Sequence, residues 1–225
     1  MRRRTRIIPI IRKDTDKKDP QLEAQVEAVL AGGCRWIQLR MKKASRNEII
    51  ETAKALKPIC AEAEAILIID DHVDIAKELE LDGVHLGKTD MNVKDAREIL
   101  GEKFIIGATA NTLDDVMAFS PIDVDYIGLG PYKFPTTKEN ISPIIELESY
   151  ANIVKVAANS KREIPIVAIG GIEYDDIDRV MSSGVDGVAV SGALINADDT
   201  QQATRQMIDK LNEILNVRLA ERGLI

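Results

Sequence analysis

The feature that most limits the fold of this chain is a regular alternation of short apolar runs with longer amphipathic segments. The runs are rich in β-branched residues, which is typical of strands, and each precedes a segment with helical spacing and a charged face. Neighbouring parallel strands need a crossover, and a helix supplies it. The eight candidate strands are RIIPII, WIQLR, AILIID, GVHL, FIIGA, DYIGLG, IPIVAIG and GVAVS.

Eight strand–helix repeats favour closure into a (β/α)₈ barrel, a fold of about 250 residues. The chain has 225 residues, and no Gly/Ser-rich linker marks a second domain, so we expect one compact α/β barrel over residues 1–225. The longest stretch without periodicity, 131–146, follows the sixth run. A loop of this length is usually functional, and we expect it to cover the site.

Composition narrows the class of partner. Hydrophobic residues make up 45% of the chain and charged residues 30%, as in a folded globular protein, and the formal net charge is -7. Sequence-independent nucleic-acid binding needs a broad basic surface, so this balance argues against it but allows small anionic substrates. No run is long enough to span a membrane or to act as a signal peptide, which predicts a cytoplasmic protein. The sequence leaves a homo-oligomer open.

Cys34 and Cys60 are far apart and lack CxxC spacing, so we expect both thiols to fill core positions.

In such barrels the chemistry lies at the carboxyl ends of the strands. After the second run, Gln38, Arg40 and Lys42 alternate, and a period of two sends all three to the same side. They form either an anion clamp or a solvated strand end with extended cations.

Carboxylates gather after the next two runs. Asp70 and Asp71 end the run ILIIDD, and Asp90 follows Gly87 in the next loop. A helix cap would explain one of the paired aspartates but not both. Carboxylate oxygens from neighbouring strand ends suit Mg²⁺, which often adds substrate phosphate oxygens to one or two protein carboxylates.

His85 lies in the GVHL run, either as a layer residue hydrogen-bonded inside the barrel or as a substrate contact. With two histidines in the chain, a His-rich metal site is excluded, and there is no G-x-S-x-G signature of a serine nucleophile.

Two regions have residues suited to phosphate. The loop after the sixth run carries two hydroxyls and a cation, and the last two runs end in small residues whose backbone can approach an anion closely. A hydrophilic surface loop and glycines that only turn the chain are the alternatives. The candidates are Thr136, Thr137, Lys138, Gly170, Gly171, Ser191 and Gly192.

Six segments, in order and spacing, resemble the thiamine phosphate synthase family over nearly the whole chain: QLRMK, IIDD, DGVHLGKTDM, GPYKFPTTK, AIGGI and VAVSGAL. The resemblance implies a (β/α)₈ transferase that joins hydroxymethylpyrimidine diphosphate to thiazole phosphate with Mg²⁺, and releases pyrophosphate and thiamine phosphate.

The resemblance also implies roles for individual residues. Asp71 and Asp90 would hold Mg²⁺. The leaving pyrophosphate would contact Arg40, Lys42, Thr109 and Lys138, and the pyrimidine would face Gln38 and His85. The thiazole phosphate would bind Thr137, Gly171, Val190 and Ser191, beside Thr136.

The chain departs from the family pattern at four positions. Asp70 replaces a usual Asn next to the metal, where it would face the substrate; Thr109 replaces a serine; and Pro135 replaces a threonine. Asn111 stands where a related thiazole tautomerase has its acid–base histidine, which argues against that alternative. A non-catalytic phosphate-ligand regulator and an unrelated sugar-phosphate barrel enzyme are the other hypotheses; the first would lose the metal ligands, and the second rests on fold alone.

Overall fold

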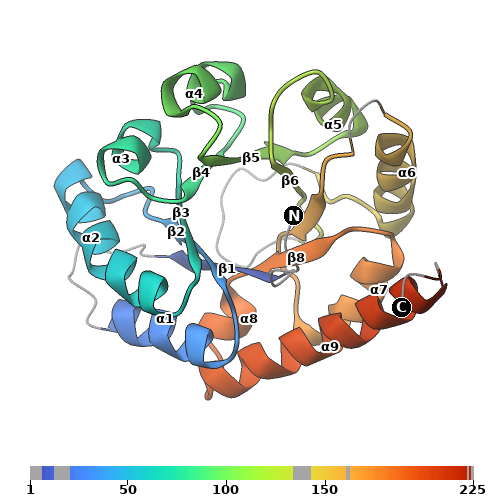
Figure 1. Ribbon diagram of the computed structural model, residues 1–225. Coiled ribbons are helices and arrows are strands. Elements are labelled where there is room, and N and C mark those ends of the chain that lie inside the picture. The colour runs from blue at the N-terminus through green and yellow to red at the C-terminus, as the bar shows by residue number, and fades with distance from the viewer. Residues whose placement is uncertain (1–6, 13–20, 134–142, 161–162, 222, 224–225) are drawn as a thin grey trace.

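The computed structural model describes residues 7–12, 21–133, 143–160, 163–221 and 223. Within them, eight parallel strands form one closed barrel in the order of the sequence, and the last strand pairs with the first (Figure 1). The predicted (β/α)₈ fold is therefore confirmed. The strands are β1 (Ile7–Arg12), β2 (Trp36–Arg40), β3 (Ile66–Asp70), β4 (Gly83–Leu86), β5 (Ile105–Ala110), β6 (Tyr126–Leu129), β7 (Ile166–Ile169) and β8 (Gly187–Val190).

Helices surround the barrel and carry the chain from each strand to the next (Figure 1). Capping residues in the local sequence fix where several helices start. Ser45 and Glu48, for example, form a capping box at the start of the second helix. The helices are α1 (Gln21–Ala31), α2 (Arg46–Glu62), α3 (Val73–Glu78), α4 (Val93–Leu100), α5 (Leu113–Phe119), α6 (Leu147–Ala158), α7 (Ile177–Ser182), α8 (Gly192–Ile195) and α9 (Thr200–Glu221), with a 3₁₀ helix η1 (Tyr174–Asp176) before α7.

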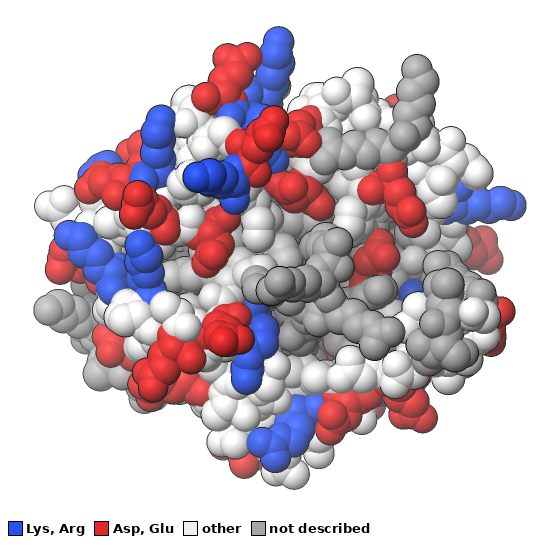
Figure 2. Space-filling view, viewed as in Figure 1, with Lys and Arg blue, Asp and Glu red and all other residues white. Residues whose placement is uncertain are grey.

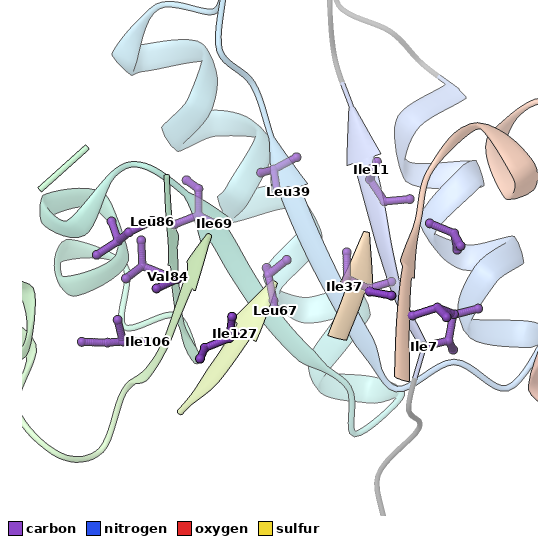
Figure 3. Close-up of a cluster of buried hydrophobic side chains, with 14 of the residues drawn as sticks. Ile7, Ile11, Ile37, Leu39, Leu67, Ile69, Val84, Leu86, Ile106 and Ile127 are labelled. Carbon is purple, nitrogen blue, oxygen red and sulfur yellow. The ribbon is translucent and has the colours of Figure 1, made fainter. Parts of the chain in front are cut away.

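The strands separate two apolar layers. On β3, Leu67 and Ile69 belong to the layer between sheet and helices, part of which is drawn in Figure 3, whereas Ile66 and Ile68 face the barrel interior. Because side chains alternate along a strand, the next inward position on β3 is Asp70. The interior thus changes from apolar to polar toward the carboxyl ends of the strands.

Aspartates bind backbone at the opposite, N-terminal end of the barrel. The Asp82 carboxylate accepts the Leu67 N–H at 2.8 Å, and Asp125 and Asp186 accept the N–H groups of Ile106 and Ile166 at 2.8 and 3.0 Å. Each aspartate lies just before an even-numbered strand and binds the preceding odd-numbered one. These carboxylates hold the strand starts together.

Both cysteines are buried, as expected, and burial raises the pKa of the Cys34 and Cys60 thiols to about 12. Acidic and basic side chains lie interspersed around the periphery of the face in Figure 2. None of the helices among the described residues is long and apolar enough to cross a membrane.

Candidate active site

The inward side chains of β2 and β3 supply the first part of the site. Trp36 faces the barrel interior, so Gln38 and Arg40, two and four residues on, lie on the same side of β2. Gln38 pairs with Ile68 in the strand register and is 2% exposed. The predicted inward direction is confirmed for Gln38 and for Arg40 at the carboxyl end of the strand, whereas Lys42 lies in the turn beyond β2.

Asp70 holds the two inward residues of β2 in place. Gln38 Nε2 donates to Asp70 Oδ1 at 2.7 Å, and Arg40 Nε lies 3.5 Å from Oδ2. Burial, followed by the charge of Asp71, raises the pKa of Asp70 to about 7, although the Gln38 hydrogen bond and Arg40 act in the opposite direction. Asp70 therefore orients Gln38 and Arg40 from inside the barrel, and the paired aspartates have different surroundings.

Asp71 belongs to a second cluster, outside the strand. Its Oδ2 lies 3.3 Å from Lys42 Nζ, and its carboxyl group shares a hydrogen bond with Asp90. Burial and then Asp90 raise the pKa of Asp71. The pKa of Asp90 is lowered because the Asp71 hydrogen bond and the Gly87 N–H outweigh the effect of its own burial. Two carboxyl groups and one ammonium thus meet at the ends of three neighbouring strands.

Backbone geometry brings these carboxyl groups together. Asp71 has a φ of +69°, a left-handed conformation that Asp tolerates better than most residues, and its N–H donates to the His85 carbonyl at 2.9 Å. Asp90 Oδ2 accepts the Gly87 N–H at 2.7 Å, and a Cβ on Gly87 would lie only 2.7 Å from that oxygen. Glycine at position 87 therefore lets the Asp90 carboxylate reach the backbone.

The Asp71–Asp90 pair suits a hard divalent cation. Both side chains offer carboxylate oxygens, and a carboxyl pair close enough to share a hydrogen bond gains from a cation that replaces the shared proton. Among the described residues, no three His, Cys, Asp or Glu side chains form a cluster that could hold a metal ion. The donor set fits Mg²⁺ on the condition that substrate oxygens and water complete its coordination.

His85 and Thr109 line the next sector of the barrel. His85 lies inward on β4, with Nδ1 2.9 Å from the Tyr126 hydroxyl and Nε2 3.0 Å from Thr109 Oγ1. Burial lowers the pKa of His85 to about 4, so its imidazole is neutral at physiological pH. Of the two alternatives left open for His85, the structure shows the hydrogen bonds within the barrel, and its contact with substrate stays a prediction.

We call the opening of the barrel at the carboxyl ends of the strands the mouth. Beside β7 and β8 it is formed by glycine turns and a loop contact. Gly170 and Gly171 have φ values of +101° and +63°, and a Cβ on Gly171 would lie 2.8 Å from Lys133 Cβ. The Lys133 N–H donates to the Gly170 carbonyl, and Lys133 Nζ contacts both carboxylate oxygens of Asp176 at 2.6 and 2.7 Å. The start of the loop after β6 is thereby fixed to the glycine turn after β7.

Val190 ends β8 and Ser191 follows it. Ser191 Oγ donates to the Ile10 carbonyl at 2.7 Å, and Val190 is 2% exposed within the layer that faces the helices. Their contribution to a ligand in the barrel mouth would therefore come from the backbone. Thr136, Thr137 and Lys138, together with Pro135, lie outside the described residues.

Three features of the site escape the sequence reasoning. In the sequence, Tyr126 is one aromatic residue at the start of a strand, with nothing to mark it as part of the site. Gly107, its partner in the strand register, is the available signal, because a glycine there leaves space for the tyrosine ring inside the barrel. The Lys133–Asp176 pair joins two loops 43 residues apart. Asn111 donates from Nδ2 to the Gly130 carbonyl at 2.5 Å, so this amide has a structural partner.

A charged mouth at the carboxyl ends of eight parallel strands is typical of (β/α)₈ enzymes whose substrates carry phosphate. The thiamine monophosphate synthase family model matches residues 8–194. Thiamine-phosphate synthase of Bacteroides fragilis is 52% identical over 180 residues, which cover 80% of this chain and 88% of the relative. That of Pyrococcus abyssi is 36% identical over 200 residues, covering 88% and 93%.

A solved structure agrees with these matches. Thiamine phosphate pyrophosphorylase from Pyrococcus furiosus superposes with a TM-score of 0.81 at 34% identity, and the match covers 94% of this chain and 97% of that one. The chain belongs to the thiamine monophosphate synthase family. It is thus a transferase of thiamine biosynthesis, as the resemblance implied.

Proposed function

We propose that the chain condenses 4-amino-2-methyl-5-hydroxymethylpyrimidine diphosphate with 4-methyl-5-(2-hydroxyethyl)thiazole phosphate and releases pyrophosphate. The observation that carries this proposal is the meeting of Lys42, Asp71 and Asp90 at the mouth, beside Arg40. A leaving diphosphate needs positive charge around it, and this cluster combines side-chain cations with a carboxyl pair that suits a divalent cation. The names of the curated relatives agree with the reaction.

Asp71 and Asp90 would hold Mg²⁺, which when bound neutralises charge that develops on the leaving diphosphate. Arg40 and Lys42 add fixed positive charge on the same side of the mouth, and Thr109 adds a hydroxyl. Because Asp70 accepts from Gln38 and lies close to Arg40, it sets the position of both side chains. The diphosphate would therefore lie over β2–β5.

The pyrimidine would lie deeper, against Gln38 and His85, both of which are buried. The thiazole phosphate would bind the backbone of Gly171, Val190 and Ser191 on the opposite side of the mouth. By the family resemblance, Thr137 and its neighbour Thr136 would bind the thiazole phosphate and Lys138 the leaving diphosphate; all three lie outside the described residues. These assignments place the thiazole ring between the two phosphate regions, facing the pyrimidine.

The chemistry then needs no protein nucleophile. The bond from the pyrimidine methylene carbon to the diphosphate oxygen breaks, and its electron pair leaves with the diphosphate. The aminopyrimidine ring delocalises the positive charge left on the methylene carbon. The lone pair of the thiazole nitrogen forms the new carbon–nitrogen bond, so the chain supplies positioning and charge neutralisation. Both substrates are small, charged molecules, and we place the reaction in the cytoplasm.

The test is a two-substrate assay on the purified chain. With both substrates and Mg²⁺, we expect thiamine phosphate and pyrophosphate in equal amounts, and we expect excess EDTA to stop the reaction until Mg²⁺ is restored. Binding of thiazole phosphate without any product at saturating substrates would contradict the proposal and favour a non-catalytic binder.

A further inference from the structure

A chain of hydrogen bonds crosses the inside of the barrel from β6 through β4 to β5. It joins the Tyr126 hydroxyl to His85 Nδ1 at 2.9 Å and His85 Nε2 to Thr109 Oγ1 at 3.0 Å. Tyr126 and His85 are 2% and 6% exposed, whereas Thr109 is only partly buried near the carboxyl end of β5. This series of hydrogen bonds therefore runs from the barrel interior to the Thr109 hydroxyl, which a substrate can reach.

The strands are shaped to hold both rings. The register pairs Tyr126 with Gly107, and a Cβ on Gly107 would lie 2.1 Å from Tyr126 Cζ. A Cβ on Gly128 would lie 3.1 Å from His85 Cε1. Trp36 packs edge-on against Tyr126, with ring centroids 5.4 Å apart. The two glycines thus make room for a tyrosine and a histidine that the surrounding core fixes in position.

The direction of each hydrogen bond follows from counting hydrogens. The Tyr126 hydroxyl carries one hydrogen, and its hydrogen-bond partner within the described part of the chain is His85 Nδ1 alone. If Nδ1 also carried a hydrogen, the buried tyrosine hydrogen would have no acceptor, an arrangement that folded proteins avoid. Tyr126 therefore donates to Nδ1. The single hydrogen of the neutral imidazole is then on Nε2, from which it is donated to Thr109 Oγ1.

We propose that Tyr126 is a positioning residue that fixes His85 as its Nε2–H tautomer and thereby commits the Thr109 hydroxyl to donate toward the mouth. Thr109 Oγ1 accepts from His85, so its own hydrogen is free for a substrate oxygen. In the other tautomer, Thr109 would donate to His85 and present only lone pairs to the mouth. That the oxygen belongs to the diphosphate rests on the function proposed above; the tautomer itself does not.

The tautomer can be measured on the full chain without substrate. The chain has two histidines, so the His72→Gln variant, labelled with ¹⁵N at its remaining histidine, reports His85 alone by long-range ¹H–¹⁵N correlation. We expect a neutral imidazole protonated at Nε2 throughout pH 6 to 8. In Tyr126→Phe, which keeps the ring but lacks the donor, we expect a substantial Nδ1–H population. A wild-type imidazole protonated at Nδ1, or at both nitrogens, would overturn the proposal.

Kinetics test the consequence for Thr109. We expect Tyr126→Phe and Thr109→Val each to lower kcat/KM for the pyrimidine diphosphate about 100- to 1,000-fold, as the loss of one donor to developing negative charge does. The KM for thiazole phosphate should change less than about twofold, since that site relies on other groups. Thr109→Ser keeps the hydroxyl and should restore most activity.

The double variant separates positioning from packing. Because Tyr126 acts through Thr109, Tyr126→Phe combined with Thr109→Val should lose little more than either change alone. Additive losses, or a Tyr126→Phe effect that appears equally in both substrates and in the Tm, would show that Tyr126 only fills space. If the wild-type chain makes no product, the proposed function fails, and the tautomer measurement still decides the hydrogen-bond order.

Discussion

Aspartates at the two ends of this barrel have contrasting partners. At the N-terminal end, Asp82 and its two counterparts accept backbone N–H groups near the starts of neighbouring strands. At the carboxyl end, Asp71 and Asp90 meet each other and a lysine ammonium. Asp90 accepts one backbone N–H as well, from Gly87, but what distinguishes the carboxyl end is that two carboxyl groups lie together, so ionising both is unfavourable without a bound cation. The same residue type therefore serves stability at one end and, we infer, catalysis at the other.

The largest expected effect is that of Asp71→Ala. This change removes one of two carboxylates proposed to hold Mg²⁺, and we expect kcat to fall by at least about 10³-fold, since charge stabilisation is the main contribution of this site. The Tm should fall by no more than about 4 °C, because alanine fits the left-handed backbone at position 71 less well than aspartate, while relief of the neighbouring Asp90 carboxyl offsets part of that cost. Steady-state kinetics and thermal unfolding measure the two effects separately.

Asp74→Ala is the matched control. Asp74 lies three residues further on and forms an exposed ion pair with Arg46, so its loss should leave kcat unchanged. Full activity in Asp71→Ala would remove the residue from the proposed mechanism and weaken the contrast between the two ends.

Gly171→Ala is expected to have the next largest effect. A Cβ at this left-handed position would press on Lys133 Cβ, so the turn must shift. We expect the KM for thiazole phosphate to rise about 10- to 100-fold, because a displaced backbone donor loses its anion. The KM for the pyrimidine diphosphate should change little.

Gly101→Ala separates backbone strain from the clash. Gly101 has a similar left-handed φ of +76° at the end of α4, with open space around it. The Gly101→Ala variant should lose about 1 kcal/mol of stability, and its KM for thiazole phosphate should be unchanged. Equal kinetic effects of the two substitutions would contradict a phosphate site at Gly171.

Asp176→Asn tests a carboxylate at the carboxyl end of the barrel whose partner, Lys133, belongs to the scaffold rather than to the proposed metal site. Burial would raise the pKa of Asp176, but hydrogen bonds from Lys133 and the Glu173 N–H outweigh it and lower that pKa. A lowered folded-state pKa contributes stability above the unfolded value of about 3.9, and this is lost as the pH falls through the folded value.

We therefore expect the wild-type chain to exceed Asp176→Asn by about 1 kcal/mol at pH 7 and the difference to shrink below about pH 4. Urea unfolding at a series of pH values measures it. A difference that grows toward acid pH would contradict the proposed ion pair.

At the scaffold end, Asp82→Ala should lower the free energy of unfolding by about 1 kcal/mol, because the Leu67 N–H loses its acceptor. Activity per folded molecule should be unchanged. Asp82→Asn keeps an acceptor oxygen and should recover part of the loss. A large fall in kcat without a stability change would reverse the assignment of the two ends.

Sequence periodicity was sufficient for the barrel because each strand repeats one pattern, and it also predicted that Gln38 and Arg40 point inward. It could not separate Asp70 from Asp71, since adjacent carboxylates look alike until one is inside the strand and the other has turned with a positive φ. Tyr126 and the Lys133–Asp176 pair depend on contacts between distant segments, which a single sequence does not specify.

Ser191→Ala is expected to have the smallest effect, and it tests whether a polar side chain at the mouth must touch substrate. The Ser191 hydroxyl donates to the Ile10 carbonyl and joins the end of β8 to β1, so its removal should cost about 1 kcal/mol of stability. The KM for thiazole phosphate should rise less than about threefold if the backbone binds the phosphate. Ser183→Ala is the matched control, because its hydroxyl makes an equivalent 2.7 Å bond to the Val180 carbonyl on α7. A tenfold or larger rise in KM for Ser191→Ala alone would mean that the hydroxyl leaves the Ile10 carbonyl to bind the phosphate. One side chain would then serve both stability and substrate binding, and the two roles would not be divided between the ends of the barrel.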